Sequence, residues 1–294
     1  MKPAFAVLMA ALLVFLPQAA VRDPAVVEFA AGTIDLQEWM PIWSDEFSGS
    51  EIDRRRWTFD IGNGFTTEDG IYIWGWGNNE LQFYTARPEN ARISNGHLVI
   101  EARRELYEGL PYTSAKLKTS GLFSMKYGKV EIRARVPAGK GLWPALWMLP
   151  EQNRYGTWAA SGEIDIMEGH GSQPEIISGA IHYGGPWPEN TYTVEEYRFP
   201  DGSTAGDFHV YTLEWESDEL RWYVDGVLYH TQTDWYSRGP GASVNHPYPA
   251  PFDQPFYLIM NLAVGGTFDG NPDDTTPFPA IMEVDYVRVY RLHR

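Results

Sequence analysis

The sequence contains no cysteine, so disulfide bonds and thiolate metal sites are both excluded. Basic residues are also few: 23 Lys and Arg stand against 39 Asp and Glu, which gives a formal net charge of −16. This balance disfavours nucleic acids as partners and sulfated polysaccharides as ligands, because both are polyanions. No long segment keeps a helical hydrophobic period, and no internal repeat or low-complexity tract is present. We therefore expect an all-β protein, stabilised by packing, whose surface suits a neutral ligand.

The N-terminus carries the pattern of a targeting segment. The apolar stretch Ala4–Leu16 follows Lys2 and precedes small residues, and it is too short for a membrane-spanning helix. We predict a signal peptide over residues 1–20, a short linker over 21–38 and a single domain over 39–294, with no stable membrane span. The predicted location is secreted or periplasmic. An uncleaved N-terminal anchor that retains the protein is the alternative.

Strand patterns recur along the rest of the chain. Apolar and charged residues alternate strictly through 129–136, and Asp225-Gly226 separates two aromatic-rich runs in the way typical of a hairpin turn. Further strand-like runs are found at 96–103, 220–232, 256–264 and 281–292. Many short strands with Gly and Pro between them predict a sandwich or jelly roll.

Aromatic residues make up 15% of the chain, with 12 Trp among them. Trp143 and Trp147 are four residues apart, so one strand would turn them to the same side. Trp215 and Trp222 alternate within regular strands, which indicates core positions. The remaining exposed tryptophans suit a groove for sugars, because pyranose faces are apolar and stack on aromatic rings.

Three carboxylates fall within six residues of an apolar run: Glu163, Asp165 and Glu168. Burying an acid on a strand costs several kcal/mol unless it is paired or has a chemical task. On a regular strand Glu163 and Asp165 share one face, whereas Glu168 points to the other. A β-bulge between Asp165 and Glu168 would bring all three into one cleft, and bulges are enriched beside active sites. The spacing therefore predicts a bulged strand.

Two carboxylates on either side of an acetal bond are the usual equipment for glycoside hydrolysis. One must be ionised to act as nucleophile or base, and the other must be protonated to donate to the leaving oxygen. Carboxylates from a single strand suit the shorter separation of retaining enzymes, so we expect retention of configuration.

The run from Glu163 to Glu168 resembles the bulged Glu-x-Asp-x-x-Glu signature of family 16 glycoside hydrolases, and most of all that of bacterial laminarinases, the endo-β-1,3-glucanases. The resemblance covers roughly residues 39–291. Matching stretches are the opening strand Trp39–Phe47, Gly75–Thr85, Tyr127–Ala134, Gly141–Leu149 and the closing strand Asp285–Tyr290. It implies a β-jelly roll of two curved antiparallel sheets with an open concave cleft. The segments 186–207 and 236–255 are predicted as long loops that wall this cleft.

The resemblance implies roles for individual residues. Glu163 would be the nucleophile, Glu168 the general acid and then the base, Asp165 an assistant between them, and His182 the neighbouring histidine. The implied sugar-contacting residues are Asn79, Lys116, Trp143, Trp147 and Trp158. Relatives often carry Arg where this chain has Lys116; Lys keeps the charge but loses the bidentate fork, so a sugar subsite would be weakened or differently tuned.

A metal is also implied, although none is needed for catalysis. Relatives often bind one structural calcium on the convex side, and the matching positions are Glu46, Gly96 and Asp285. Calcium prefers hard oxygen ligands. Ordinary strand-end acids that form hydrogen bonds are the alternative reading of these residues.

The predicted function is a retaining endo-β-1,3-glucanase acting on laminarin-type glucans, and the predicted state is a monomer. The alternatives are the same chemistry on mixed-linkage glucan, agarose or carrageenan, a transglycosylase, and a glucan-binding lectin-like protein. The extra residue Met167 argues against the mixed-linkage lichenases, which resemble the shorter Glu-x-Asp-x-Glu form.

Overall fold

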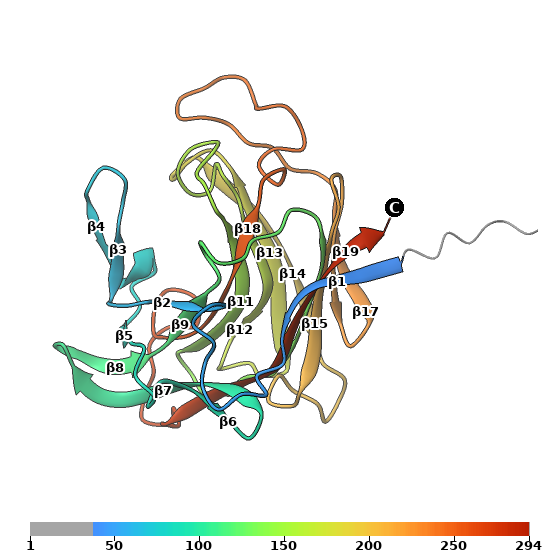
Figure 1. The fold of residues 1–294 in the computed structure, drawn as a ribbon. Helices are drawn as coiled ribbons and strands as arrows, with labels where there is room; N and C mark the ends of the chain where they lie inside the picture. The colour runs from blue at the N-terminus through green and yellow to red at the C-terminus, as the bar shows by residue number, and fades with distance from the viewer. Residues whose placement is uncertain (1–37, 294) are drawn as a thin grey trace, which may run out of the picture. The chain divides into compact units, whose positions relative to one another are not determined.

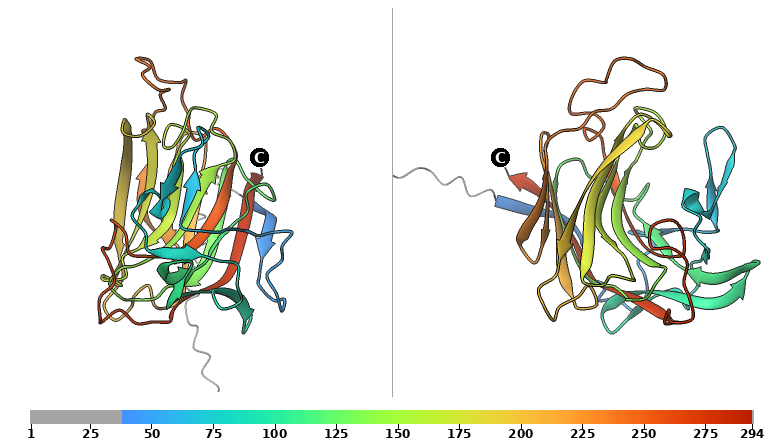
Figure 2. Two further views of the ribbon diagram at one scale, coloured as in Figure 1. Left: turned by 90° about the vertical axis from the view of Figure 1, so that its left-hand side faces the viewer. Right: turned by 180° about the vertical axis from the view of Figure 1, so that it is seen from behind.

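The computed structural model describes residues 38–293, so the predicted signal peptide and nearly all of the predicted linker lie outside the described residues. Two sheets pack face to face, as Figures 1 and 2 show, and their strands pair antiparallel except for the parallel pair β5–β8. One contains ten strands in the order β17-β16-β15-β10-β19-β7-β8-β5, with β1 beside β19 and β6 beside β7. The other contains seven, in the order β14-β13-β12-β11-β18-β9-β2. The predicted all-β sandwich is confirmed.

The strands of the larger sheet are β1 (Glu38–Asp45), β5 (Gln82–Tyr84), β6 (Ala91–Ser94), β7 (His97–Tyr107), β8 (Leu110–Ser114), β10 (Gly128–Arg135), β15 (His209–Trp215), β16 (Leu220–Val224), β17 (Val227–Gln232) and β19 (Ala280–His293). Those of the smaller sheet are β2 (Thr58–Asp60), β9 (Lys116–Lys118), β11 (Leu142–Pro150), β12 (Glu163–Gly169), β13 (Ile176–Gly184), β14 (Asn190–Arg198) and β18 (Phe256–Val264). A separate hairpin of β3 (Gly64–Thr66) and β4 (Tyr72–Trp74) precedes a single 3-10 turn, η1 (Gly75–Gly77).

The core lies between the two sheets and follows the predicted alternation. Val130, Ile132 and Ala134 on β10 point into it and are fully buried. Trp215 and Trp222 are also fully buried, which confirms their assignment to the core. Fully burying large apolar side chains of this kind contributes about 1.5–3 kcal/mol each, so this layer is a main source of stability.

The hairpin predicted at Asp225-Gly226 is confirmed, since β16 and β17 pair directly across it. Both turn residues adopt positive φ, 50° and 80°, as a two-residue hairpin turn of this type requires. Within the described residues, no helix is long and apolar enough to cross a membrane.

One predicted loop is wrong. The segment 186–207 contains β14, which pairs with β13 from Ile176↔Arg198 to Gly184↔Asn190. β14 is an edge strand whose side chains are mostly exposed or half-buried, so its sequence lacks the apolar alternation by which strands are found. The segment 236–255 carries no strand, in agreement with the prediction.

Candidate active site

The acidic run forms β12, in the middle of the seven-stranded sheet. Its register shifts by one residue: Asp165 lies opposite Ala180 of β13, but Glu168 lies opposite Ser178. Pairing with the neighbouring strand β11 shows the same extra residue in β12, because Trp147 lies opposite Asp165 and Ala145 lies opposite Glu168. Because Ala145 and Trp147 are two residues apart on a regular strand, they share a face, and so do their partners. The predicted bulge is therefore confirmed.

The bulge absorbs two consecutive apolar side chains. Ile166 and Met167 are both buried in the core, whereas an unbulged strand would turn one of them outward. Burying both, together with Ile164, compensates for the disrupted ladder and leaves all three carboxylates on the other face. The sequence thus builds the cluster by hydrophobic burial on the back of the same strand.

His182 completes the cluster from β13. It lies directly opposite Glu163 in the strand register, and its Nε2 atom is 3.7 Å from Glu163 Oε1 and 3.4 Å from Asp165 Oδ2. The Asp165 carboxylate is almost fully buried. A buried anion needs a countercharge, and among the described residues the His182 imidazole is placed to supply it.

Two tryptophans donate to the two glutamates separately. The indole N–H of Trp158 donates to Glu163 Oε2 at 2.9 Å, and that of Trp143 donates to Glu168 Oε1 at 3.1 Å. Trp143 lies on β11 beside the bulge, while Trp158 comes from the loop between β11 and β12. Each glutamate therefore has its own aromatic donor.

The electrostatics separate the two glutamates. Burial, followed by the charge of Asp165, raises the pKa of Glu163 to about 7, while His182 and the Trp158 N–H oppose the rise. Burial and the same Asp165 charge hold the pKa of Glu168 well above its ordinary value. Burial lowers the pKa of His182, but the surrounding carboxylates outweigh it and raise that pKa to about 9. At neutral pH the arrangement favours a protonated Glu168 beside a cationic His182.

Lys116 lies at the β9 side of the same sheet and is nearly buried. Its Nζ atom is 4.2 Å from the ring centre of Trp76 and 4.9 Å from that of Trp147, and 3.5 Å from Asp60 Oδ2. The cation also lowers the pKa of Glu163. The structure thus places the Lys116 cation between the rings of Trp76 and Trp147.

The five predicted sugar-contacting residues differ in position. Trp143 and Trp147 lie on one face of β11 as predicted, since the alternate residues Leu142, Leu146 and Met148 are in the core. Trp158 is 38% exposed beside Glu163. Asn79 is exposed in a turn at φ 60°, and no hydrogen bond joins its side chain to the three carboxylates.

Sequence reasoning missed the neighbour of Asn79. Glu80 is buried and accepts hydrogen bonds from Gln82 Nε2 at 2.6 Å and Tyr84 OH at 3.2 Å. Asn261 in turn donates to Tyr84 OH and accepts from the Trp147 indole N–H at 2.7 Å. The period-two spacing of Glu80, Gln82 and Tyr84 is a signal that could have revealed this network, because such residues share one face of an extended chain.

Two of the predicted calcium residues, Glu46 and Asp285, have side chains that are paired with arginines. Both carboxylate oxygens of Glu46 accept from the guanidinium of Arg288, and Asp285 pairs with Arg133 at 2.5 Å. Gly96 occupies a turn at φ 79°. Arginine already neutralises each acid, so a divalent cation that bound through these carboxylates would compete with two ion pairs.

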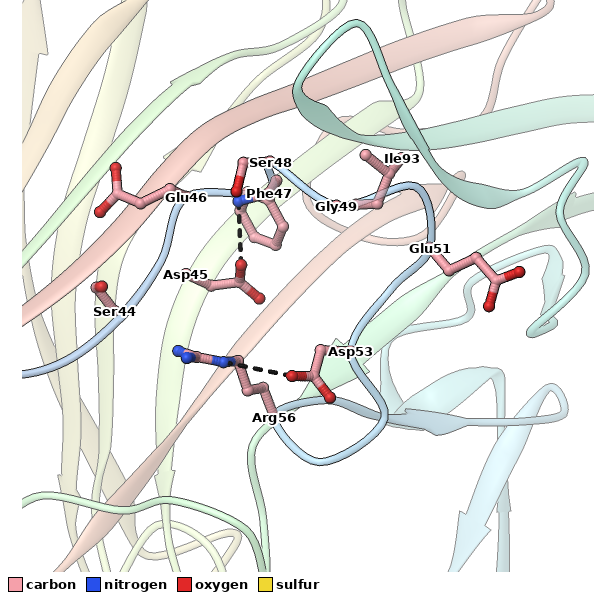
Figure 3. Close-up of a pocket in the computed structure, with 10 residues that line it drawn as sticks. All are labelled: Ser44, Asp45, Glu46, Phe47, Ser48, Gly49, Glu51, Asp53, Arg56 and Ile93. Atoms are coloured by element: carbon pink, nitrogen blue, oxygen red, sulfur yellow. Dashed lines mark hydrogen bonds and ion pairs between the residues drawn. The ribbon is translucent and has the colours of Figure 1, made fainter.

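A cavity of about 280 Å³ lies beside Glu46, and Figure 3 shows its lining. Asp45 accepts hydrogen bonds from the Phe47 N–H at 3.0 Å and from the Trp57 indole N–H at 2.9 Å. Its carboxylate therefore stabilises the local turn. The Glu46 side chain extends away from Asp45 in this view. The acids here are therefore engaged separately rather than gathered around a point.

Elsewhere in the described part of the chain, one group of three could offer ligand atoms within 4.8 Å of one another: Glu163, Asp165 and His182. The surrounding carboxylates raise the pKa of His182 to about 9, so its ring is a cation and a proton donor at neutral pH. The cluster is thus suited to acid–base chemistry.

Comparison with known proteins agrees with this chemistry. The sequence model described as glycosyl hydrolases family 16 matches residues 77–288. The glucan endo-1,3-β-glucosidase A1 of Niallia circulans is 48% identical over 262 residues, which cover 85% of this chain but only 37% of that protein. The β-glucanase of Rhodothermus marinus is 48% identical over 259 residues, covering 86% of this chain and 85% of the relative. The solved catalytic domain of a laminarinase from Thermotoga petrophila RKU-1 is 42% identical, with a TM-score of 0.75, over 88% of this chain and all of that domain.

Proposed function

This chain belongs to family 16 of the glycosyl hydrolases, and from that premise we propose that it is a retaining endo-β-1,3-glucanase acting on laminarin-type glucans. The observation that carries the proposal is the bulged strand β12, which presents Glu163 and Glu168 on one face with different hydrogen-bond donors. The substrate is taken from the relatives named for β-1,3-glucan hydrolysis.

Glu163 is the nucleophile of this proposal. Of the two glutamates it has the less elevated pKa, and the cationic His182 lies 3.7 Å from its carboxylate, which favours the ionised form. Its attack on the anomeric carbon forms a covalent glycosyl-enzyme and breaks the glycosidic bond.

Glu168 is the acid and then the base. Its strongly raised pKa keeps a proton available at neutral pH, which it donates to the departing glycosidic oxygen. The carboxylate that results then takes a proton from water, and that water releases the sugar from Glu163 with net retention. The reaction needs no cofactor.

Asp165 and His182 form an ion pair beside the two glutamates. Asp165 is buried, and its carboxylate lies 3.4 Å from His182 Nε2, so the imidazolium is in contact with it. The negative potential of Asp165 also opposes premature loss of the Glu168 proton.

The decisive experiment is reducing-sugar release with product sizing from laminarin, lichenan, agarose and carrageenan. We expect early release of mixed oligosaccharides from laminarin, and loss of turnover with retained glucan binding in Glu163→Gln and Glu168→Gln. Wild-type turnover in Glu163→Gln would overturn the mechanism. Activity on a galactan alone would keep the mechanism and overturn the substrate. Long products at high substrate concentration would indicate transglycosylation, and binding without release would indicate a lectin-like protein.

We further propose that the protein is exported and then acts as a monomer. The support for export is the apolar segment Ala4–Leu16 after Lys2 at the start of the sequence. Mass spectrometry of the mature protein from culture medium would test this, because export with cleavage predicts a new N-terminus near residue 21. Light scattering would test the monomer.

A further inference from the structure

Three aromatic rings from three separate segments stack in order beside Glu168. Trp143, which donates to Glu168, has the Phe268 ring parallel to its own, with centres 4.6 Å apart and planes 16° apart. The other face of Phe268 lies on the His170 ring, at 3.8 Å and 12°. Aromatic pairs in such geometry restrict each other's tilt, so Phe268 limits the orientations that the Trp143 indole can take.

Asp269, the next residue after Phe268, fixes the loop that carries this ring. Its side chain is 3% exposed, and Oδ2 accepts from the Gly141 N–H at 2.7 Å and from the Ser172 N–H at 3.1 Å. The Ser172 hydroxyl donates to Oδ1, and His170 Nδ1 lies 3.7 Å from the same atom. One buried carboxylate therefore ties the segment before β11 to the segment after β12. Hydrogen bonds to a carboxylate are stronger than those between neutral groups, so these bonds hold the two segments firmly in position.

The same loop is held at its beginning as well. The Gly265 N–H donates to the Gly141 carbonyl at 2.7 Å, and the Thr267 N–H donates to the Asn78 carbonyl at 2.9 Å. Gly141 has φ 75°, and a Cβ on it would come within 2.3 Å of the Pro272 nitrogen, so the chain must pass very close at this point. Phe268 thus extends from a short segment that is anchored on both sides.

We propose that Phe268 and Asp269 are positioning residues for Glu168: Asp269 fixes the loop, and Phe268 holds the Trp143 indole at the angle at which its N–H meets the carboxylate. The proposal rests on the acid–base role of Glu168 given above. Neither residue has to touch the substrate for this task. Their effect reaches the reaction through one hydrogen bond, Trp143 Nε1 to Glu168 Oε1.

The consequence is a change in the acidity of Glu168. A donor to a carboxylate favours the ionised form, so loss of the Trp143 hydrogen bond raises the pKa of Glu168 further. The other groups that act on Glu168 are Asp165 and Glu163 on its own strand, which raise that pKa, and His182 on β13, which lowers it. Across the core, Tyr229 on β17 also senses the Glu168 charge.

The test is the pH profile of kcat/KM on laminarin for Phe268→Ala and Trp143→Phe. Because the first step requires protonated Glu168, we expect the alkaline limb to move up by roughly one pH unit in both variants. The double variant should show no further movement, since both changes remove the same hydrogen bond. Phe268→Tyr, which keeps the ring, should restore the wild-type limb.

Phe123 offers a matched control, because its ring also stacks on a tryptophan, Trp43, at 4.8 Å and 15° but away from β12. Phe123→Ala should leave the limb in place. If Phe268→Ala destabilises the fold, Phe268→Leu keeps apolar bulk without the planar stack and should move the limb alike. A lower kcat with an unmoved limb would overturn the proposal, as would movement in Trp143→Phe alone. Either result would leave the proposed function standing, because that depends on the loss of turnover in Glu163→Gln.

Discussion

Replacing Glu163 by Gln should stabilise the protein, and increasingly so at higher pH. Burial raises the pKa of this carboxyl from 4.5 to about 7. Below pH 4.5 the group is protonated in both the folded and unfolded chains, so it does not affect stability. Above pH 7 it is ionised in both, and the folded state then bears the whole cost of the buried charge. Through this group the wild-type protein loses stability as pH rises through the window, and the glutamine variant lacks that part of the loss.

The size of the effect follows from the shift. A difference of about 2.5 pKa units corresponds to about 3 kcal/mol once both states are fully ionised. Between pH 5 and pH 8.5 the stability difference between variant and wild type should grow by about 2.5 kcal/mol. The side chain of Gln is nearly isosteric, and its oxygen can still accept from the Trp158 indole, so packing contributes little to the change.

Urea unfolding followed by tryptophan fluorescence, at both pH values, measures this directly. The slope of the free energy with urea should be the same in both proteins, because the surface exposed on unfolding is unchanged. Glu89→Gln, at an exposed position, serves as the control and should change stability about equally at the two pH values. An equal difference at both pH values for Glu163→Gln would refute the reasoning, since Glu163 would then ionise in the cleft as it does in the unfolded chain.

Two further predictions concern charges around the cleft and on the convex side. Lys116→Gln removes a cation that lowers the pKa of Glu163, so that pKa should rise and the acidic limb of kcat/KM should move to higher pH, while Lys116→Arg should keep it. A pH titration of both variants with laminarin checks this, and an unmoved limb in Lys116→Gln would contradict it. Calcium added to the chelator-treated protein should leave the melting temperature unchanged, because Glu46 and Asp285 are each paired with an arginine. A clear rise with calcium in differential scanning fluorimetry would mean that those ion pairs open to admit the ion.

Local pattern accounts for the parts of the fold that could be predicted. Strands such as β10 and β18 follow from alternation or apolar runs, which depend on neighbours in the sequence. The bulge could also be predicted from local spacing. On a regular strand, Ile164, Ile166 and Met167 could not all point into the core while the three acids share the opposite face. The edge strand β14 could not be predicted in this way, because its side chains are exposed or half-buried and its sequence shows no alternation of apolar and polar residues.

The partners of the cleft residues depend on contacts between distant segments. Asp269 meets Gly141 across 128 residues and Ser172 across 97, and nothing in the local sequence specifies either contact. The same holds for Trp147 and Asn261, which are 114 residues apart. Likewise, the arginines that neutralise Glu46 and Asp285 come from other strands, so an acid that looked available for a metal proved to be paired.

The sequence by itself determined that this protein is an all-β sandwich with a carboxylate cluster on a bulged strand, because both depend on spacing along a few residues. Only the tertiary structure decided how the two glutamates differ. Their burial, the imidazolium of His182 and the separate donors Trp143 and Trp158 come from other strands and loops. An ionisation equilibrium depends on every charge and dipole within several ångströms, and the fold alone sets those distances.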